Sequence, residues 1–270
     1  MTRFFVAPQW QGSPSARAMR LIDGAEAIAD DLPRSALTRI EVPTEAGESL
    51  GTGIRRFSTL ARVREAIADV VTAADDPAVI VGGDCAVALP GIAAAAARHP
   101  SLAVVWFDAH GDLHTPESSP SGALAGMALR AAVAPGPFTD APPATDARTV
   151  LVGARALDDA EADLLDSSPI SMLSADALAD PAALAEAVAA TGAEAVYVHI
   201  DLDVLDPATV IGVLEPVPFG AQPAEVIAAI GRLRERMPLV GASLSGFAPA
   251  SRDAAVEDLG TILRLLGALA

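Results

Sequence analysis

Residues 102–112 have the sequence LAVVWFDAHGD, and residues 195–203 have the sequence AVYVHIDLD. Each segment begins with a continuous apolar run, which is typical of a strand buried on both faces of a parallel sheet. Each run leads into acidic or imidazole side chains at alternate positions, and alternate side chains of a strand point to the same side. The two segments therefore predict two buried strands that carry polar groups at one end.

The polar groups at these two strand ends have the chemistry of metal ligands. Asp108, His110 and Asp112 can converge on one point, and Asp201 and Asp203 can converge in the same way. Four carboxylates and an imidazole in one place would repel each other unless cations lay between them. The simplest interpretation is a carboxylate-rich site for two divalent metal ions.

The rest of the chain alternates between strand and helix patterns. Strands are predicted at Phe4–Ala7, Thr38–Val42, Ala78–Val81, Leu102–Phe107, Thr149–Val152, Pro169–Met172, Ala195–Ile200 and Pro238–Ser243. Helices are predicted at Ala18–Asp31, Thr59–Ala74, Ala86–Ala97, Ala123–Val133, Asp159–Asp166, Asp180–Ala190, Gln222–Arg236 and Asp253–Leu266. Such alternation indicates an α/β fold, a parallel sheet with helices on both faces. Because the pattern resumes after the Pro-rich segment 135–143, we expect residues 1–270 to form a single domain.

The amino-acid composition restricts the binding partners and the cellular location that can be expected. The formal net charge is −17, from 35 acidic against 18 basic residues, so nucleic acid and anionic membrane surfaces are disfavoured as partners. Cys85 is the only cysteine, which excludes an intramolecular disulfide and favours a cytoplasmic location. The apolar run within residues 1–8 is too short for a signal peptide, and no segment has the length of a membrane span.

The candidate ligands lie where an open parallel sheet binds its ligands, beyond the carboxyl ends of the strands. Cys85 follows one predicted strand, and the groups at 108–112 and 201–203 follow two others. Oxygen-rich ligation with a little nitrogen suits Mn²⁺ or a similar hard cation. Two such ions about 3.5–4 Å apart can hold a hydroxide between them, so the pattern predicts a hydrolase.

Four motifs in this order resemble those of the ureohydrolases, the family of arginases, agmatinases and formiminoglutamases. The motifs are Gly82-Gly83-Asp84-Cys85, Asp108-Ala109-His110-Gly111-Asp112, Ser121-Gly122-Ala123-Leu124 and His199-Ile200-Asp201-Leu202-Asp203-Val204-Leu205-Asp206-Pro207. The resemblance implies a three-layer α/β/α sandwich with a mostly parallel central sheet of about eight strands. It also implies two Mn²⁺ ions per chain, a small-molecule substrate with a guanidino or amidino group, and C–N hydrolysis by a metal-bridging hydroxide. Family members often form trimers or hexamers, so a homo-oligomer is an option that the sequence leaves open.

Carried over position by position, the resemblance implies the ligands of both ions. The first ion would be held by Cys85, Asp108, Asp112 and Asp201, and the second by His110, Asp108, Asp201 and Asp203. Asp84 and Asp206 are better interpreted as turn or cap residues.

The chain departs from the family at position 85, which is usually histidine. Cys85 would have to bind as a thiolate, because the thiol hardly binds metal. The alternative is that Cys85 is a small buried filler. We expect Cys85→Ala to lose one metal ion preferentially.

Two more departures concern the substrate. Ala125 takes the place of the arginase histidine that moves a proton to the leaving amine, and Gly246 that of a glutamate that binds the guanidinium. His114 is a candidate for the proton transfer or for a substrate contact, and it could also be an exposed loop residue. Ser121 and Asp158 match substrate-contacting positions.

Two other features near the motifs concern the surroundings of the site. His199 is interpreted either as a partner of a ligand carboxylate or as a core histidine. The segment 211–220 lacks the usual Thr-Gly-Thr-Pro of the family, so the wall of the pocket that it forms is expected to differ.

These departures leave three functions to weigh. The first is a manganese hydrolase of a modified guanidine such as N-hydroxyarginine, whose more acidic leaving group needs less help from a proton shuttle. The second is a metal-binding family member with a regulatory or binding role. The third is a phosphohydrolase, which ranks last because the chain has no lysine and only Arg155 lies near a motif.

Overall fold

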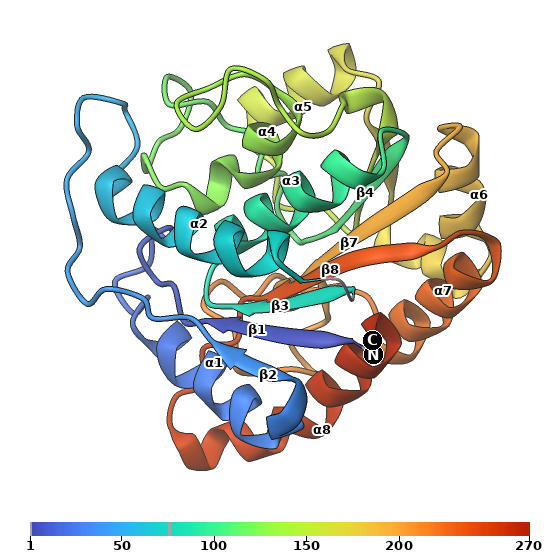
Figure 1. Cartoon of the computed structure of the whole chain (residues 1–270). Helices are drawn as coiled ribbons and strands as arrows, with labels where there is room; N and C mark the ends of the chain where they lie inside the picture. The colour runs from blue at the N-terminus through green and yellow to red at the C-terminus, as the bar shows by residue number, and fades with distance from the viewer. Residues whose placement is uncertain (1, 75–76) are drawn as a thin grey trace.

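The computed structural model describes residues 2–74 and 77–270, and its centre is one eight-stranded sheet (Figure 1). The strands are β1 (Arg3–Ala7), β2 (Leu37–Arg39), β3 (Ala78–Gly82), β4 (Leu102–Phe107), β5 (Thr149–Val152), β6 (Ser171–Leu173), β7 (Ala195–Asp201) and β8 (Leu239–Ser245). They lie in the order β2-β1-β3-β8-β7-β4-β5-β6, and every pair of neighbours is parallel. The carboxyl ends of all eight strands therefore meet at one edge of the sheet.

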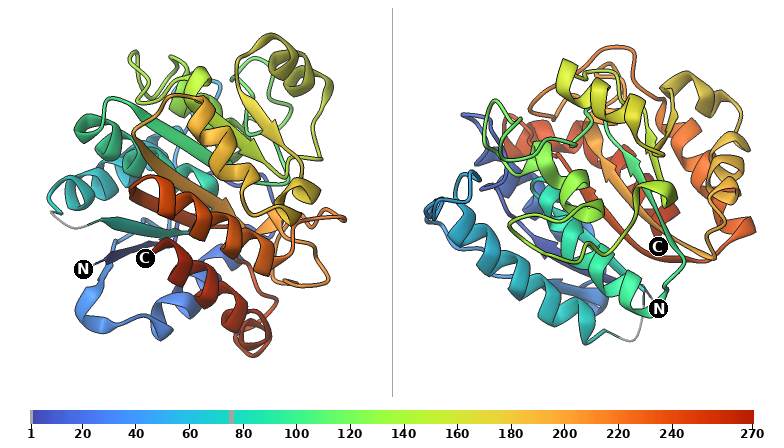
Figure 2. Two further views of the ribbon diagram at one scale, coloured as in Figure 1. Left: turned by 90° about the vertical axis from the view of Figure 1, so that its right-hand side faces the viewer. Right: turned by 90° about the horizontal axis from the view of Figure 1, so that it is seen from above.

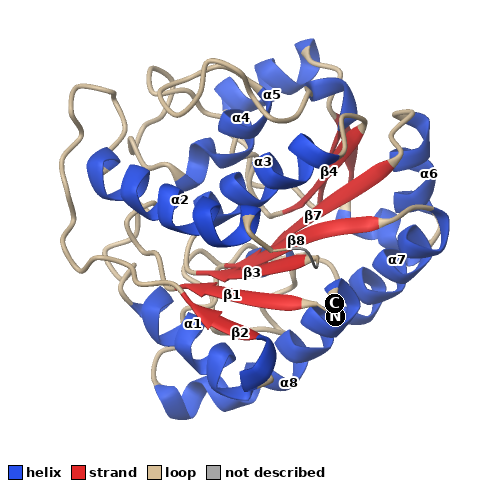
Figure 3. Ribbon diagram, viewed as in Figure 1, coloured by secondary structure: helices blue, strands red, loops and turns tan. Residues whose placement is uncertain are grey.

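Helices cover both faces of this sheet, as Figures 2 and 3 show. The helices are α1 (Arg20–Asp31), α2 (Phe57–Thr72), α3 (Ala88–Arg98), α4 (Ala128–Val133), α5 (Asp159–Ser167), α6 (Ala183–Ala190), α7 (Pro223–Arg236) and α8 (Arg252–Leu269). Helices α1, α8, α7 and α6 pack in series on one face, while α2, α3 and α4 pack in series on the other. The three-layer α/β/α fold predicted from the sequence is confirmed.

The strands are buried on both sides, which explains their continuous apolar runs. All six residues of β4 and all seven of β7 are buried. Alternate β4 residues face opposite layers: Val105 packs into the core under α6 and α7, and Trp106 packs into the core under α3 and α4. A strand with apolar contacts on both faces has no need of the polar alternation that marks a half-exposed strand.

The predicted elements differ from the observed ones mainly at their ends. The helix expected from Ala123 begins at Ala128, after a 3₁₀ turn at Ala125–Met127. The helix expected from Asp180 begins at Ala183, because the Asp180 carboxylate accepts a hydrogen bond from the Ala182 N–H and holds a turn there. Within the described residues, no helix is long and apolar enough to cross a membrane.

Candidate metal centre

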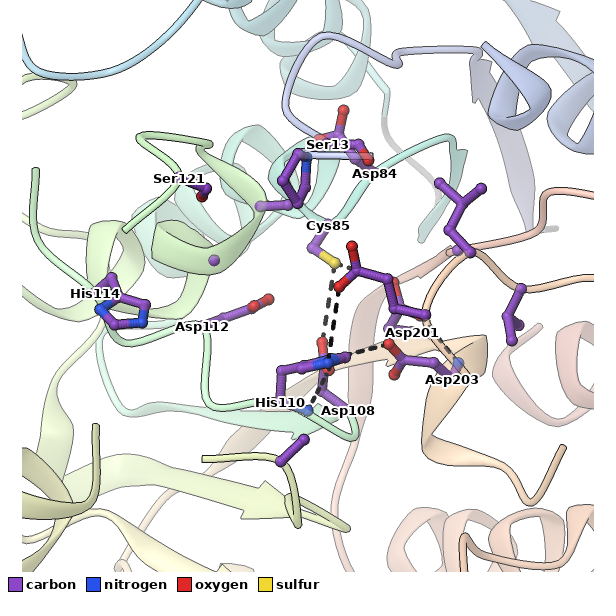
Figure 4. Close-up of a pocket in the computed structure, with 18 of the residues that line it drawn as sticks. Ser13, Asp84, Cys85, Asp108, His110, Asp112, His114, Ser121, Asp201 and Asp203 are labelled. Atoms are coloured by element: carbon purple, nitrogen blue, oxygen red, sulfur yellow. Dashed lines mark hydrogen bonds and ion pairs between the residues drawn. The ribbon is translucent and has the colours of Figure 1, made fainter. Parts of the chain in front are cut away.

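The candidate ligands lie at the carboxyl ends of three strands, β3, β7 and β4, with β8 between β3 and β7. Cys85 follows β3, Asp201 ends β7, and Asp108 follows β4. Residues from three distant parts of the sequence thereby meet in one place, drawn in Figure 4. They line a cavity of about 330 Å³.

Strand alternation is not what brings the ligands together, contrary to our prediction. Strand β4 ends at Phe107, and residues 202–204 form a 3₁₀ turn. Hydrogen bonds within one loop and between the two loops hold the ligands in place instead. The Asp108 carboxylate accepts from the His110 N–H (2.7 Å), and the Asp203 carboxylate accepts from the Ala109 N–H (3.0 Å). The two loops are therefore locked to each other through the side chains of the candidate ligands.

Two groups of candidate ligand atoms lie side by side. Cys85, Asp108, His199 and Asp201 offer donor atoms within 4.8 Å of one another, and so do Asp108, His110 and Asp203. Asp108 belongs to both groups, which suits a carboxylate that bridges two ions. In the second group, His110 Nδ1 lies 3.0 Å from Asp203 Oδ2 and 3.3 Å from Asp108 Oδ1.

Asp112 lies in the same cavity but outside both groups. Its backbone has φ +53°, and its carboxylate points toward Cys85 and Asp201 in Figure 4. Asp112 Oδ2 is buried and has no hydrogen-bond partner among the described residues. A buried carboxylate oxygen without a partner is costly, and a cation in the cavity would supply the missing contact.

The electrostatics of the cluster favour bound cations. Burial, together with the charge of neighbouring carboxylates, raises the pKa of Asp201 to about 7 and that of Asp203 to about 6. Burial, followed by the charges of Asp201, Asp112 and Asp108, raises the pKa of the Cys85 thiol well above its usual range. These buried acids and the thiol can all ionise together only if positive charge lies nearby. Two divalent ions would supply that charge, so the donor set fits a binuclear metal site.

Cys85 is buried and directed at the acids. Its Sγ lies 3.0 Å from Asp201 Oδ2, to which the thiol donates, and 3.9 Å from Asp108 Oδ2. The Ser245 hydroxyl donates to the same Asp201 oxygen at 2.9 Å. The place of Cys85 in the ligand group favours a ligand over a passive filler.

His199 belongs to the first group but contacts Asp201 through serine. Its Nδ1 lies 2.8 Å from Ser243 Oγ, and its Nε2 lies 3.5 Å from Ser245 Oγ. Ser245 thus stands between His199 and Asp201, a contact that the sequence prediction missed. The signal was available, because Ser243 and Ser245 are polar residues at alternate positions of a strand that is otherwise apolar.

The residues predicted to contact the substrate line the same cavity as the candidate metal ligands. His114 Nε2 lies 3.1 Å from Asp158 Oδ2, and His114 Nδ1 lies 3.1 Å from Ser118 Oγ. His114 is buried, so it is not an exposed loop residue. Asp158 also caps α5, because its Oδ1 accepts from the Glu161 N–H. Ser121 lines the same cavity.

The structure also shows acids whose place the sequence did not indicate. Glu161 is buried in the cavity wall and accepts a hydrogen bond from the Leu113 N–H. Glu215 lines the same cavity. Asp84, in contrast, is held by Gln9, Gly12 and Ala86, as expected of a turn residue.

A family model described as the arginase family matches residues 18–261. The chain belongs to the arginase family. It is accordingly a metal-dependent hydrolase of non-peptide C–N bonds.

Two curated relatives resemble most of the chain. An N(omega)-hydroxy-L-arginine amidinohydrolase from Streptomyces lavendulae is 31% identical, over 77% of this chain and 74% of the relative. An arginase from Bacillus caldovelox is 31% identical, over 76% of this chain and 73% of the relative. The arginase family predicted from the motifs is confirmed.

Solved structures agree with the fold. An arginase from Bacillus cereus superimposes with a TM-score of 0.79 at 26% identity, covering 99% of this chain and 97% of that one. An Entamoeba histolytica arginase in complex with L-ornithine superimposes with a TM-score of 0.84 at 22% identity, with the same coverage.

Proposed function

We propose that this protein is a binuclear manganese hydrolase that cleaves a C–N bond of a small guanidino compound. One observation carries the proposal: donor atoms from three strand ends meet at a cavity that also holds the buried, unpartnered Asp112 oxygen. Cys85, Asp108, Asp112 and Asp201 would hold one ion, and Asp108, His110, Asp201 and Asp203 the other.

When bound, the two ions lower the pKa of water and so supply a nucleophile at neutral pH. The protein's own part is to fix the ligands and to receive the substrate. Ser245 and the Asp203 N–H fix Asp201, since both donate to its carboxylate. A thiolate at position 85 would bring the donor set to four carboxylates and one thiolate, a charge of −5 against +4 from the ions. Such a centre is less positive than one with a neutral histidine, which favours a substrate that is itself cationic.

The cavity supports a cationic substrate. Its charged lining residues outside the ligand set are the acids Asp84, Asp158, Glu161 and Glu215, and no arginine is among the described lining residues. A guanidinium group matches such a wall in charge and in the number of its hydrogen-bond donors. A phosphate ester does not.

His114 is the residue that we assign to proton transfer. Its backbone N–H donates to the Gly126 carbonyl at 3.1 Å, and His114 lines the cavity together with Ala125, the position of the missing shuttle. Asp158 orients the ring through Nε2. We expect His114→Ala to lower kcat about 10²–10⁴-fold, the usual contribution of general acid–base catalysis. Metal content should stay at the wild-type level, and an unchanged kcat would exclude the role.

The substrate that we favour is a modified guanidine such as N-hydroxyarginine. Cleavage that releases hydroxyurea frees the same alkyl amine that arginine frees, so a proton donor is still needed, and His114 lines the cavity where it could supply the proton. The relative from Streptomyces lavendulae, named for action on this compound, supports the choice. Ser121 and Asp158, which line the cavity, would contact the far end of the substrate.

The test is a substrate panel on manganese-loaded protein, with detection of urea, hydroxyurea and ammonia. Arginine, N-hydroxyarginine and agmatine are compared after the bound metal has been counted by mass spectrometry. Two manganese ions with release of one of these products support the proposal. Two ions with no turnover across the panel would instead support a metal-binding role without catalysis.

The remaining proposals concern domain organisation, cellular location and oligomeric state. We propose that residues 1–270 act as one arginase-like domain, supported by the single continuous sheet. A cytoplasmic location is supported by the presence of just one cysteine. Assembly into a homo-oligomer would be tested by light scattering.

A further inference from the structure

At the end of β8 the cavity is lined by Gly246, where other family members have an acid. The backbone geometry at Gly246 explains why no acid is present there. Its backbone has φ +89°, which disfavours any residue other than glycine. A Cβ atom at this position would lie 2.2 Å from Asp201 Oδ1. No side chain fits between the end of β8 and this proposed ligand, so a group that recognises a cation has to come from elsewhere.

The neighbouring loop supplies an acid beside the same place. Val213 pairs with Phe247 in an antiparallel bridge, and the Ala248 N–H donates to the Gly212 carbonyl at 2.7 Å. The segment that follows β8 and the segment 211–215 therefore run side by side. Glu215, two residues beyond the bridge, lines the cavity together with Gly246.

The Glu215 carboxylate lies close to the ligand group and is free to accept hydrogen bonds. Its Oε2 lies 3.9 Å from His110 Nε2, which is beyond hydrogen-bond distance. Its side chain is 49% exposed. Within residues 2–74 and 77–270, no arginine lies within ion-pair distance of it.

We propose that Glu215 binds the cationic group of the substrate, in place of the acid that is missing at Gly246. This inference rests on the proposed function, because it assumes a guanidinium-type substrate in this cavity. A carboxylate accepts two parallel N–H groups of a guanidinium in one plane, which fixes both the position and the orientation of the substrate. The Glu215 carboxylate, which lies near His110, would thus place the reacting carbon beside the proposed metal ligands.

The loop that carries Glu215 is anchored on both sides, so the backbone that positions Glu215 is held in place. Before it, Asp258 accepts hydrogen bonds from the N–H groups of Ile211 (3.1 Å) and Gly212 (2.8 Å). After it, the Arg155 guanidinium donates to the carbonyls of Val217 (2.7 Å) and Pro218 (3.0 Å). Anchoring of this kind lowers the entropy cost of binding.

The other acids of the cavity wall are already engaged. Asp158 caps α5 and contacts His114, while Glu161 holds the Leu113 N–H. Asp84 is bound by Gln9 and the Gly12 N–H. Glu215 is the lining acid that none of these contacts occupies.

Glu215→Gln tests the proposal, because it keeps the shape of the side chain and removes its charge. The probes are butylguanidinium and butylurea, which share a chain and a planar head but differ in charge. Their affinities for manganese-loaded protein are measured by isothermal titration calorimetry. The control is Glu117→Gln, which removes the same charge from an exposed loop residue near the cavity.

The expected result is a loss of about 10–100-fold in affinity for butylguanidinium in Glu215→Gln, as for a hydrogen bond between charged groups. Butylurea affinity, manganese content and the Glu117→Gln control should match the wild type. Equal butylguanidinium affinity in variant and wild type, or no binding by the wild type, would overturn the proposal. Loss of manganese in Glu215→Gln would also overturn it, because the carboxylate would then act through His110.

The two proposals fail separately. If the wild type binds butylguanidinium through Glu215 but hydrolyses nothing in the substrate panel, the hydrolase proposal fails and the assignment of Glu215 stands. If guanidino compounds are hydrolysed and Glu215→Gln leaves their KM unchanged, the assignment of Glu215 fails alone.

Discussion

Gly246→Ala adds one methyl group at the most crowded point of the site. The Cβ would lie 2.2 Å from Asp201 Oδ1 and 2.8 Å from Asp201 Cγ, whereas ordinary contacts begin at 3.4 Å. The Asp201 carboxylate must therefore move by about 1 Å, far more than the ~0.2 Å that metal coordination tolerates. Because Asp201 is proposed to bridge both ions, the substitution should weaken both.

The loss of stability follows from the same geometry. Alanine at φ +89° costs about 1 kcal/mol relative to glycine. Displacing Asp201 weakens its hydrogen bonds from Ser245 Oγ (2.9 Å) and the Asp203 N–H (3.0 Å), each worth about 1 kcal/mol. A total of about 3 kcal/mol corresponds to a fall in Tm of roughly 6–12 °C for a chain of this size.

The assay compares Gly246→Ala with Gly231→Ala in the middle of α7. A Cβ at Gly231 would have no atom within 4 Å, so this control should be neutral or stabilise the helix by about 0.5–1 kcal/mol. Tm is measured without metal, and manganese affinity is measured by calorimetry. A Gly246→Ala protein with wild-type Tm and full manganese affinity would refute the crowding argument.

Three further predictions follow from the site. Cys85→Ala should lose one ion preferentially, as counted by mass spectrometry, and two tightly bound ions in this variant would exclude Cys85 as a ligand. Since the pKa values of Asp201 and Asp203 are raised to about 7 and about 6, metal-free protein should lose stability as pH rises from about 4 through 7. Stabilisation by manganese should therefore grow over that range, and a pH-independent effect on Tm would contradict the burial of these acids. Arg155→Met should raise KM for cationic substrates more than it lowers kcat, because it frees the loop at Val217; equal changes would indicate a general loss of structure.

The sequence predicted the fold because its signal is local. Apolar runs separated by helix-forming segments gave the positions of all eight strands and all eight helices among the described residues. The errors lie at ends such as Asp180, where a side chain and the backbone compete for one N–H. Such competition depends on single contacts, which periodicity does not record.

The candidate site was predictable in its residues but not in its geometry. Asp108 and Asp201 follow strands, so their meeting could be inferred from a parallel sheet. The position of Asp203 depends on a hydrogen bond between two loops, and that of His110 on a side-chain bond within its own loop; apolar periodicity encodes neither. Glu215 was out of reach for the same reason, since it enters the cavity only through the pairing of Val213 with Phe247.

The order of the strands in the sheet determines when the site can form during folding. β8, the last strand in the sequence, lies between β3 and β7 and joins two half-sheets that have no other shared neighbour. Until residues 239–245 insert, Cys85 on one half cannot approach Asp201 and Asp108 on the other. Residues 239–245 must therefore leave the ribosome before the donors can gather. Metal capture would then report completed folding, and an incomplete chain would not take up both ions.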